Sequence, residues 1–153
     1  MTVPEGWHRA EQPLTPHLVD PREVLSLATF PLRYREGACA HMPTGALEEM
    51  TSADVLLTVQ ERGLGPASEA AGFPPRPAHF RFEPGQGSEA VQCVRGPVRF
   101  VDHWFTFSDG GRHFHVEVAL GESAPEARRL DAYRILDSLR IDPDVRPDWT
   151  SSG

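Results

Sequence analysis

The sequence predicts an α+β fold: an antiparallel sheet of about five to seven strands, covered by a long C-terminal helix and a short helix. Residues 98–107 and 113–120 are rich in Val, Phe and Trp, and the Ser108-Asp109-Gly110-Gly111 sequence between them is typical of a hairpin turn. Apolar residues then recur at helical spacing from residue 132 to residue 139. Strands followed by an amphipathic helix favour a sheet with that helix on one face.

The length and composition indicate a single globular domain. The chain has 153 residues, of which 39% are hydrophobic and 24% charged, as is ordinary for a globular protein. A chain of this length can build a hydrophobic core without disulfides or bound metals. We therefore expect one domain over residues 1–153, in which residues 1–6 and 142–153 form frayed tails.

Four elements are expected in the first 60 residues. Residues 7–10 are short enough for an edge strand or an ordered arm. Residues 23–30 predict a buried strand that ends at Pro31. Thr44 is a suitable cap for a short helix. The compact apolar run VLLTV, residues 55–59, predicts a central strand.

The middle of the chain is rich in Pro and Gly. Residues 63–77 predict a long connection without regular structure, with a short polyproline segment at residues 73–77. A loop of this kind is either functional or a solvated linker that Phe73 holds against the body, and the linker is the favoured interpretation. Residues 79–82 alternate between polar and apolar side chains and predict a strand, and residues 89–94 predict another.

The predicted hairpin has two different faces. A loop of residues 109–112 would set Phe107 opposite Phe114, which gives the core face by two-residue alternation. The same register sets Phe105 opposite Val116. The other face carries Asp102, Trp104 and Thr106 against His113, His115 and Glu117. Trp104 is apolar on this otherwise polar face, and we expect the Pro-rich loop to cover it. The alternative is that Trp104 anchors a binding surface.

The C-terminal helix is expected over residues 124–139. Ser123 and Glu126 have the spacing of a capping box. The apolar stripe that would face the sheet consists of Ala132, Ile135, Leu136 and Leu139. Residues 139–141 precede Asp142-Pro143 and predict a short strand that returns to the edge of the sheet.

Charge and cysteine usage limit the classes of protein. The formal net charge of −7 argues against a general nucleic-acid or anionic-membrane binder. No stretch approaches the roughly 20 apolar residues that span a bilayer. Residues 1–7 lack the basic and apolar regions of a secretory signal, so we expect none. We expect a cytoplasmic protein, in which Cys39 and Cys93 are free thiols because the cytosol is reducing. The alternative is a disulfide between them, worth about 4 kcal/mol.

The end of the chain resembles a known group of folds. The residues that carry the likeness are Gly111, Arg112, residues 114–118 and residues 135–139. They resemble the ending of the PsbP-like group, which includes Ran-binding adaptors, photosystem accessory subunits, small bacterial lipoproteins and chaperones of secreted effectors. The wider order, with an early Trp and FPPRP in mid-chain, resembles uncharacterised small actinobacterial proteins. The resemblance implies an antiparallel sheet covered by helices, usually without catalysis, and it transfers no site residues.

One group of side chains has the chemistry of a metal site. His113, His115 and Glu117 alternate along one strand face, and imidazole and carboxylate groups suit zinc or a similar divalent ion. Their side chains lie about 7 Å apart along a strand, so one ion cannot easily take all three without a ligand from a neighbouring strand. A polar sheet face without metal is the favoured interpretation, and we expect neither a metal nor a cofactor.

We expect a non-catalytic binding module, such as an adaptor, chaperone or accessory subunit, because no catalytic or cofactor motif stands out. Its partner would be another protein, with no role for nucleic acid. The candidate contact residues are Phe73, Arg76, Trp104, Thr106, His113, His115 and Glu117. Two alternatives remain open: a metal-dependent or acid–base enzyme built on His113, His115 and Glu117, and a domain that binds a small apolar ligand between sheet and helix.

Overall fold

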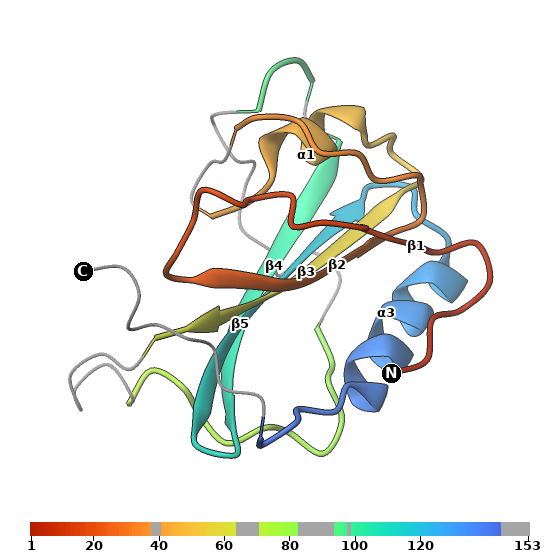
Figure 1. Cartoon of the computed structure of the whole chain (residues 1–153). Helices are drawn as coiled ribbons and strands as arrows, with labels where there is room; N and C mark the ends of the chain where they lie inside the picture. Colours follow the sequence, from red (N-terminus) through yellow and green to blue (C-terminus); the bar gives the residue numbers. More distant parts are fainter. Residues whose placement is uncertain (38–40, 64–70, 83–93, 98, 145–153) are drawn as a thin grey trace.

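The computed structural model describes residues 1–37, 41–63, 71–82, 94–97 and 99–144, and it has the predicted α+β architecture (Figure 1). A five-stranded antiparallel sheet has the order β1-β2-β3-β5-β4. The elements are β1 His8–Arg9, β2 Arg22–Ala28, α1 Thr44–Glu49, β3 Val55–Arg62, β4 Phe100–Asp109, β5 Arg112–Gly121 and α3 Glu126–Ser138. The predicted edge strand, buried strand, central strand and hairpin are all present.

The hairpin of β4 and β5 has the predicted register. Phe107 pairs with Phe114 and Phe105 with Val116, so the two faces of the hairpin are divided as the sequence indicates. Gly110 and Gly111 form the turn with φ angles of +59° and +76°. Positive φ at both central residues of a two-residue turn matches the right-handed twist of the strands and favours glycine.

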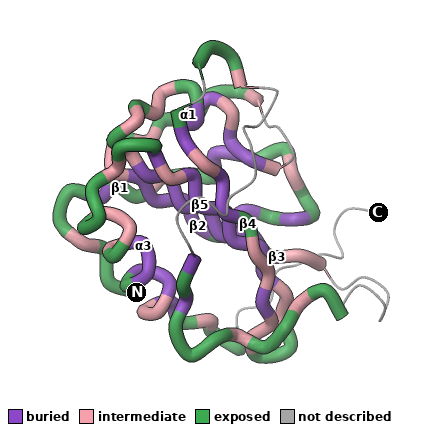
Figure 2. The backbone as a smooth tube through the Cα atoms, turned by 180° about the vertical axis from the view of Figure 1, so that it is seen from behind, coloured by how far each residue is buried: buried purple, intermediate pink, exposed green. Residues whose placement is uncertain are grey.

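One face of the sheet forms the main core, here called the core face. Alternate residues of β3, β5 and β4 point to this face, among them Leu57, Val59, Phe107, Phe114, Val116 and Val118. Helix α3 covers it with the predicted stripe, since Ala132, Ile135 and Leu136 are at most 1% exposed. Figure 2 shows this buried centre in purple along the strands and the inner side of α3.

The opposite face, here called the polar face, is covered at one end by a second apolar cluster. Ala46 and Leu47 of α1 pack there with Leu56 of β3 and Ala119 of β5. Leu14 joins them from the segment between β1 and β2. The rest of this face carries polar side chains, which form the candidate site described below.

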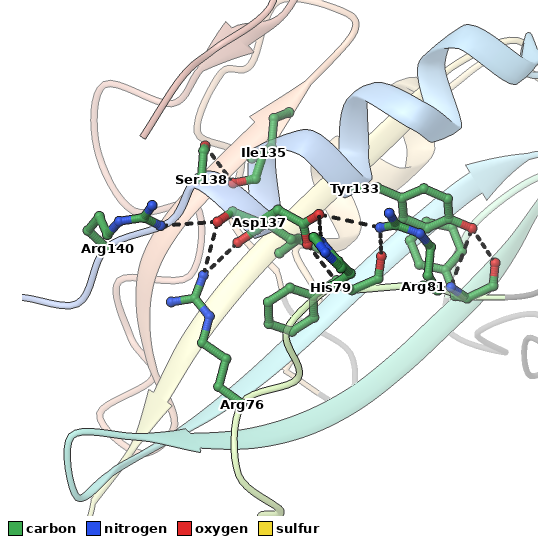
Figure 3. A network of polar contacts seen from close by, with 11 residues as sticks. Arg76, His79, Arg81, Tyr133, Ile135, Asp137, Ser138 and Arg140 are labelled. Carbon is green, nitrogen blue, oxygen red and sulfur yellow. Dashed lines mark hydrogen bonds and ion pairs between the residues drawn. The ribbon is translucent and has the colours of Figure 1, made fainter.

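Residues 72–82, here called the strap, run beside the end of β4 and along the end of α3 (Figures 1 and 3). Ser108 of β4 donates its N–H to Pro74 O (2.7 Å) and accepts from Arg76 N–H (2.9 Å). Farther along, Asp137 of α3 accepts a 2.7 Å hydrogen bond from Phe80 N–H. The strap is therefore fixed to both layers of the fold.

The strand expected at residues 79–82 is not formed. The alternation does predict which side chains are buried, because Phe80 and Phe82 lie in the core, whereas His79 and Arg81 are exposed. However, the backbone polar groups of this segment bond to side chains of α3 instead of a neighbouring strand. Asp137 accepts from Phe80 N–H, and the Tyr133 hydroxyl bonds to the backbone of Phe82 (Figure 3). An apolar–polar pattern can thus arise from side-chain packing alone.

The ends of both helices differ from the predictions. Pro43 and Pro125 occupy the N-cap positions, and neither helix has a side-chain cap. The predicted cap at Thr44 and the predicted Ser123–Glu126 capping box are therefore wrong. Ser123 instead contacts the Ser52 hydroxyl at 2.8 Å. Helix α3 is also shorter than the predicted residues 124–139. Within the described residues, neither helix has the length and apolar character needed to cross a bilayer.

The closing strand predicted at residues 139–141 is not formed either. Leu139 is buried in the main core and Ile141 packs against it, so their apolar character reflects packing rather than strand pairing. At the other end of the chain, residues 1–6 contact α3. Thr2 N–H donates to the Ser138 hydroxyl (3.0 Å), and Arg128 donates to Glu5 O (3.0 Å).

Several predictions lie outside the described residues. These are Cys39 and Cys93 with their redox state, residues 64–70 of the connection expected at 63–77, the first residue of the strand expected at 98–107, nearly all of the strand expected at 89–94, and most of the C-terminal tail expected from residue 142.

Asp137→Ala should free the strap from α3. The carboxylate accepts from Phe80 N–H and contacts His79 (3.1 Å) and Arg81 (3.4 Å), so its removal should cost about 1–3 kcal/mol in the free energy of unfolding. Urea unfolding measures this cost, and tryptic cleavage after Arg81 should become faster. Asp137→Asn is the matched variant, which keeps an acceptor for Phe80 N–H and should lose less. Unchanged unfolding and unchanged cleavage of Asp137→Ala would contradict this role.

Candidate functional site

The structure brings six of the seven predicted contact residues to the polar face. Trp104 lies directly opposite Glu117, and Thr106 lies directly opposite His115, on the paired strands β4 and β5. His113 follows on the same face, opposite Ser108. Phe73 of the strap packs on both histidines, with ring centroids 5.0 Å from His113 and 5.2 Å from His115. Strand alternation, together with the strap, thus assembles one continuous aromatic and polar surface.

The described part of the Pro-rich loop, residues 71–77, does not cover Trp104, contrary to the prediction. Phe73 stacks on His115 instead, and Trp104 remains 53% exposed. Its ring touches His115 edge to face, with centroids 5.1 Å apart. The strap can follow only the end of β4, because its backbone bonds to Ser108 and Gly72 O accepts from the Thr106 hydroxyl (2.6 Å). Trp104 lies two residues before Thr106.

Arg76 lies apart from this surface. Its guanidinium donates to Asp109 Oδ2 (3.0 Å). It also donates to Leu136 O at the C-terminal end of α3 (2.9 Å), as Figure 3 shows. It also lies 5.5 Å over the ring of Phe80. A cation at a helix C-terminus is stabilised by the helix dipole. Arg76 is therefore placed to hold the strap, the hairpin end and α3 together.

Beneath the exposed residues, the polar face holds buried groups whose hydrogen bonds are incomplete. His115 and Glu117 are each 4% exposed, and Gln60 of β3, opposite His115, is fully buried. Gln60 Nε2 donates to His41 O (2.7 Å), but Gln60 Oε1, His115 Nδ1 and Glu117 Oε2 have no hydrogen-bond partner among the described residues. Buried polar atoms normally find a partner, so three on one face indicate an unusual environment.

Glu117 is the group most strongly affected by this environment. Burial, followed by the nearby carboxylate of Asp102, raises the pKa of Glu117 to about 8. Burial, followed by the charges of Arg62 and His41, lowers the pKa of His115 to about 4. Both groups are therefore uncharged at neutral pH. Shifts in these directions follow from removing charged forms from water.

A second buried carboxylate on the same face provides a contrast. Glu23 of β2 accepts from the Thr15 N–H and hydroxyl (2.8 Å each) at one oxygen and from the Ser26 hydroxyl (2.7 Å) at the other. Both of its oxygens thus have donors supplied by the fold. Glu117, two strands away, has no donor at Oε2. The carboxylate on the β2 side of the polar face is thus fully hydrogen-bonded within the chain, whereas the carboxyl group on the β5 side is not.

The predicted residues do not come together as a metal site. Among the described residues, no three His, Cys, Asp or Glu side chains are grouped closely enough to hold an ion. His113, His115 and Glu117 point to one face but are spaced along β5, as strand geometry requires.

Sequence reasoning missed Gln60 and gave Asp102 only a minor role. Gln60 directly follows the VLLTV run, where the predicted strand ends. β3 instead continues to Arg62, which places Gln60 in the centre of the sheet opposite His115. The sequence signal was the alternation of Leu56, Thr58, Gln60 and Arg62 within the longer strand.

Comparisons with protein-family models, with curated proteins and with solved structures find no match. Any function must therefore be argued from the geometry of the chain itself.

Glu117→Gln should remove a pH dependence from the stability of the protein. Between pH 4.5 and 8, folded Glu117 keeps a proton that the unfolded chain has released. Glu117 should therefore make the protein lose stability as the pH rises, by up to about 1.4 kcal/mol per pH unit. The best window is about pH 7 to 8, because above its ordinary pKa of 6.5 His115 is mostly neutral in the unfolded chain as well as in the folded protein.

Urea unfolding across that window tests this expectation, because Glu117→Gln should lack the slope. Glu122→Gln, at an exposed position just after β5, makes the same chemical change and should keep the wild-type slope. Parallel stability curves for wild type and Glu117→Gln would show that Glu117 titrates near its ordinary pKa.

Proposed function

We propose that this chain is a non-catalytic binding module that recognises a protein partner through the recognition surface, defined as Phe73, Trp104, Thr106 and His113. The observation that carries the proposal is the 53% exposure of Trp104 on an otherwise ordered strand. Trp is enriched among the residues that dominate protein interfaces, where it supplies a large area at a small entropic cost. A half-exposed Trp fixed beside polar groups is suited to this role.

The surroundings of Trp104 support recognition because they are rigid. β4 is paired with β5 along ten residues, and the strap adds a bridge between Pro75 and Ser108. Phe73 is stacked on His115 and contacts His113 edge to face, so the aromatic groups keep fixed positions before a partner arrives. Prior organisation of this kind reduces the entropy lost on binding. His113 and Thr106 add polar atoms at the rim, as in typical interfaces.

A cytoplasmic location and the absence of catalysis, both expected from the sequence, are part of this proposal. The likeness of the chain end to the PsbP-like group supports a role without catalysis, and a cytoplasmic location belongs to the same proposal. An adaptor, a chaperone and an accessory subunit would each use such a surface. The apolar-ligand alternative has less support, because a contiguous apolar cluster fills the layer between the sheet and α3.

An acid–base enzyme is the second candidate, because strongly shifted pKa values are common at active sites. General acid–base catalysis needs a side chain that is held within reach of its substrate, usually by hydrogen bonds to neighbouring groups. Glu117 Oε2 and His115 Nδ1 have no such bonds among the described residues. Binding is therefore the function that this geometry supports better.

Trp104→Ala should abolish partner binding while leaving the fold intact. About half of this side chain is in water, so its truncation should cost less than the roughly 3–5 kcal/mol of a buried Trp. Partner binding is measured by chemical crosslinking in the source cells, followed by quantification of each protein recovered with a tagged chain. Leu130→Ala is the control, because Leu130 is 40% exposed on α3.

A protein that is recovered with wild type and Leu130→Ala, but lost with a stable Trp104→Ala, would support the recognition surface. Equal recovery with all three chains would contradict it. A loss of stability in the range of a buried Trp would show that Trp104 is a packing residue.

A further inference from the structure

Three buried groups behind the recognition surface lack the same kind of partner. Gln60 Oε1, His115 Nδ1 and Glu117 Oε2 lie on one face of β3 and β5 and are each at least nine-tenths buried. Gln60 lies directly opposite His115 on the neighbouring strand. Glu117 is the diagonal neighbour of Gln60, and the residues of such a diagonal pair are about 7–8 Å apart. These atoms therefore border one region of the polar face.

Each of the three atoms can accept a hydrogen bond. The orientation of the Gln60 amide is fixed because its Nε2 donates to His41 O, which leaves the carbonyl oxygen as the atom without a partner. A neutral imidazole accepts at one nitrogen, and an ionised carboxylate accepts at both oxygens. The group that would complete this region is therefore a donor of several hydrogen bonds.

The negative charge that acts on Glu117, unlike the Arg62 and His41 charges that act on His115, favours a cationic donor beside Glu117. The carboxylate of Asp102 acts on Glu117 strongly enough to disfavour a second negative charge. A cation would relieve this repulsion, whereas an anion would increase it. Trp104, directly opposite Glu117, offers an aromatic face that also attracts cations. The net charge of −7 adds attraction at longer range.

We propose that the region bordered by Gln60, His115 and Glu117, next to Trp104, binds an arginine side chain of the partner protein. A guanidinium presents five N–H donors in one plane and is more weakly hydrated than an ammonium, so it suits a buried site with several acceptors. Its flat face can also stack on the Trp104 indole. This inference rests on the proposed binding function and specifies the chemistry of the partner.

Binding of the guanidinium is coupled to a proton. At neutral pH the free protein holds a proton on Glu117, and the carboxylate forms when the cation binds, so one proton passes to the buffer. Affinity should therefore rise with pH until about pH 8, by up to about tenfold per pH unit. The other charged groups near this region are Asp102 of β4, and Arg62, His41 and Asp20, which act on His115.

The test uses two short peptides, acetyl-Gly-Arg-Gly-amide and the same peptide with citrulline in place of arginine. Citrulline has nearly the same shape and no charge. NMR titration of the whole chain should show the Arg peptide shifting the amide signals of Gln60 and Glu117 and the Trp104 indole signal. The citrulline peptide and the Glu117→Gln protein should each give at least tenfold weaker binding, and Glu122→Gln should match wild type.

Three results would overturn this inference. The first is the absence of Arg-dependent shifts at these signals with millimolar peptide. The second is equal binding of the Arg and citrulline peptides, and the third is binding of free agmatine without binding of the Arg peptide, which would indicate a small-molecule amine site. Loss of the crosslinked partner in Trp104→Ala would still support the recognition surface in all three cases, so the two proposals fail separately.

Discussion

The register of the β4–β5 hairpin is the constraint on which both faces of the protein depend. Gly110 and Gly111 close the hairpin with a two-residue turn, and this turn sets Phe107 opposite Phe114. Because side chains alternate along a strand, a slip by one residue would move the apolar set of β4 away from α3 and bring the polar set into the core. The same register determines that Trp104, His115 and Glu117 share the opposite face. One turn thus determines the core and the candidate site together.

The polar face shows two ways in which a sheet can hold a buried carboxylate. At Glu23 the fold supplies donors from Thr15 and Ser26, so the carboxylate is completed within the chain. At Glu117 burial and Asp102 act without a compensating donor at Oε2, and the carboxyl keeps its proton up to a pH of about 8. A buried group left in this state lowers stability, as expected where a site is organised for a partner rather than for folding alone. The exposed Trp104 lies next to this group, not next to Glu23.

The sequence predicted the elements that depend on local pattern and missed those that depend on distant partners. The hairpin register and the α3 stripe follow from turn chemistry and periodicity, and both are confirmed. The alternation of residues 79–82 predicted burial correctly but not the absence of a strand, because the backbone of this segment bonds to Asp137 and Tyr133, which are more than 50 positions away. For the site, alternation placed Trp104 and Glu117 on one face. It could not show that the strap would leave Trp104 exposed, or that β3 would bring Gln60 beside His115.

The central claim is that Glu117 is a buried carboxyl group without a donor in the free protein. An NMR titration of protein with ¹³C-labelled Glu side chains measures the ionisation of this group directly, because each carboxyl carbon shifts when it loses its proton, and Glu117→Gln identifies the signal. The account predicts a midpoint near pH 8 for Glu117, far above its ordinary value of 4.5. A midpoint close to 4.5 would show that Glu117 is solvated or paired, and would contradict the account.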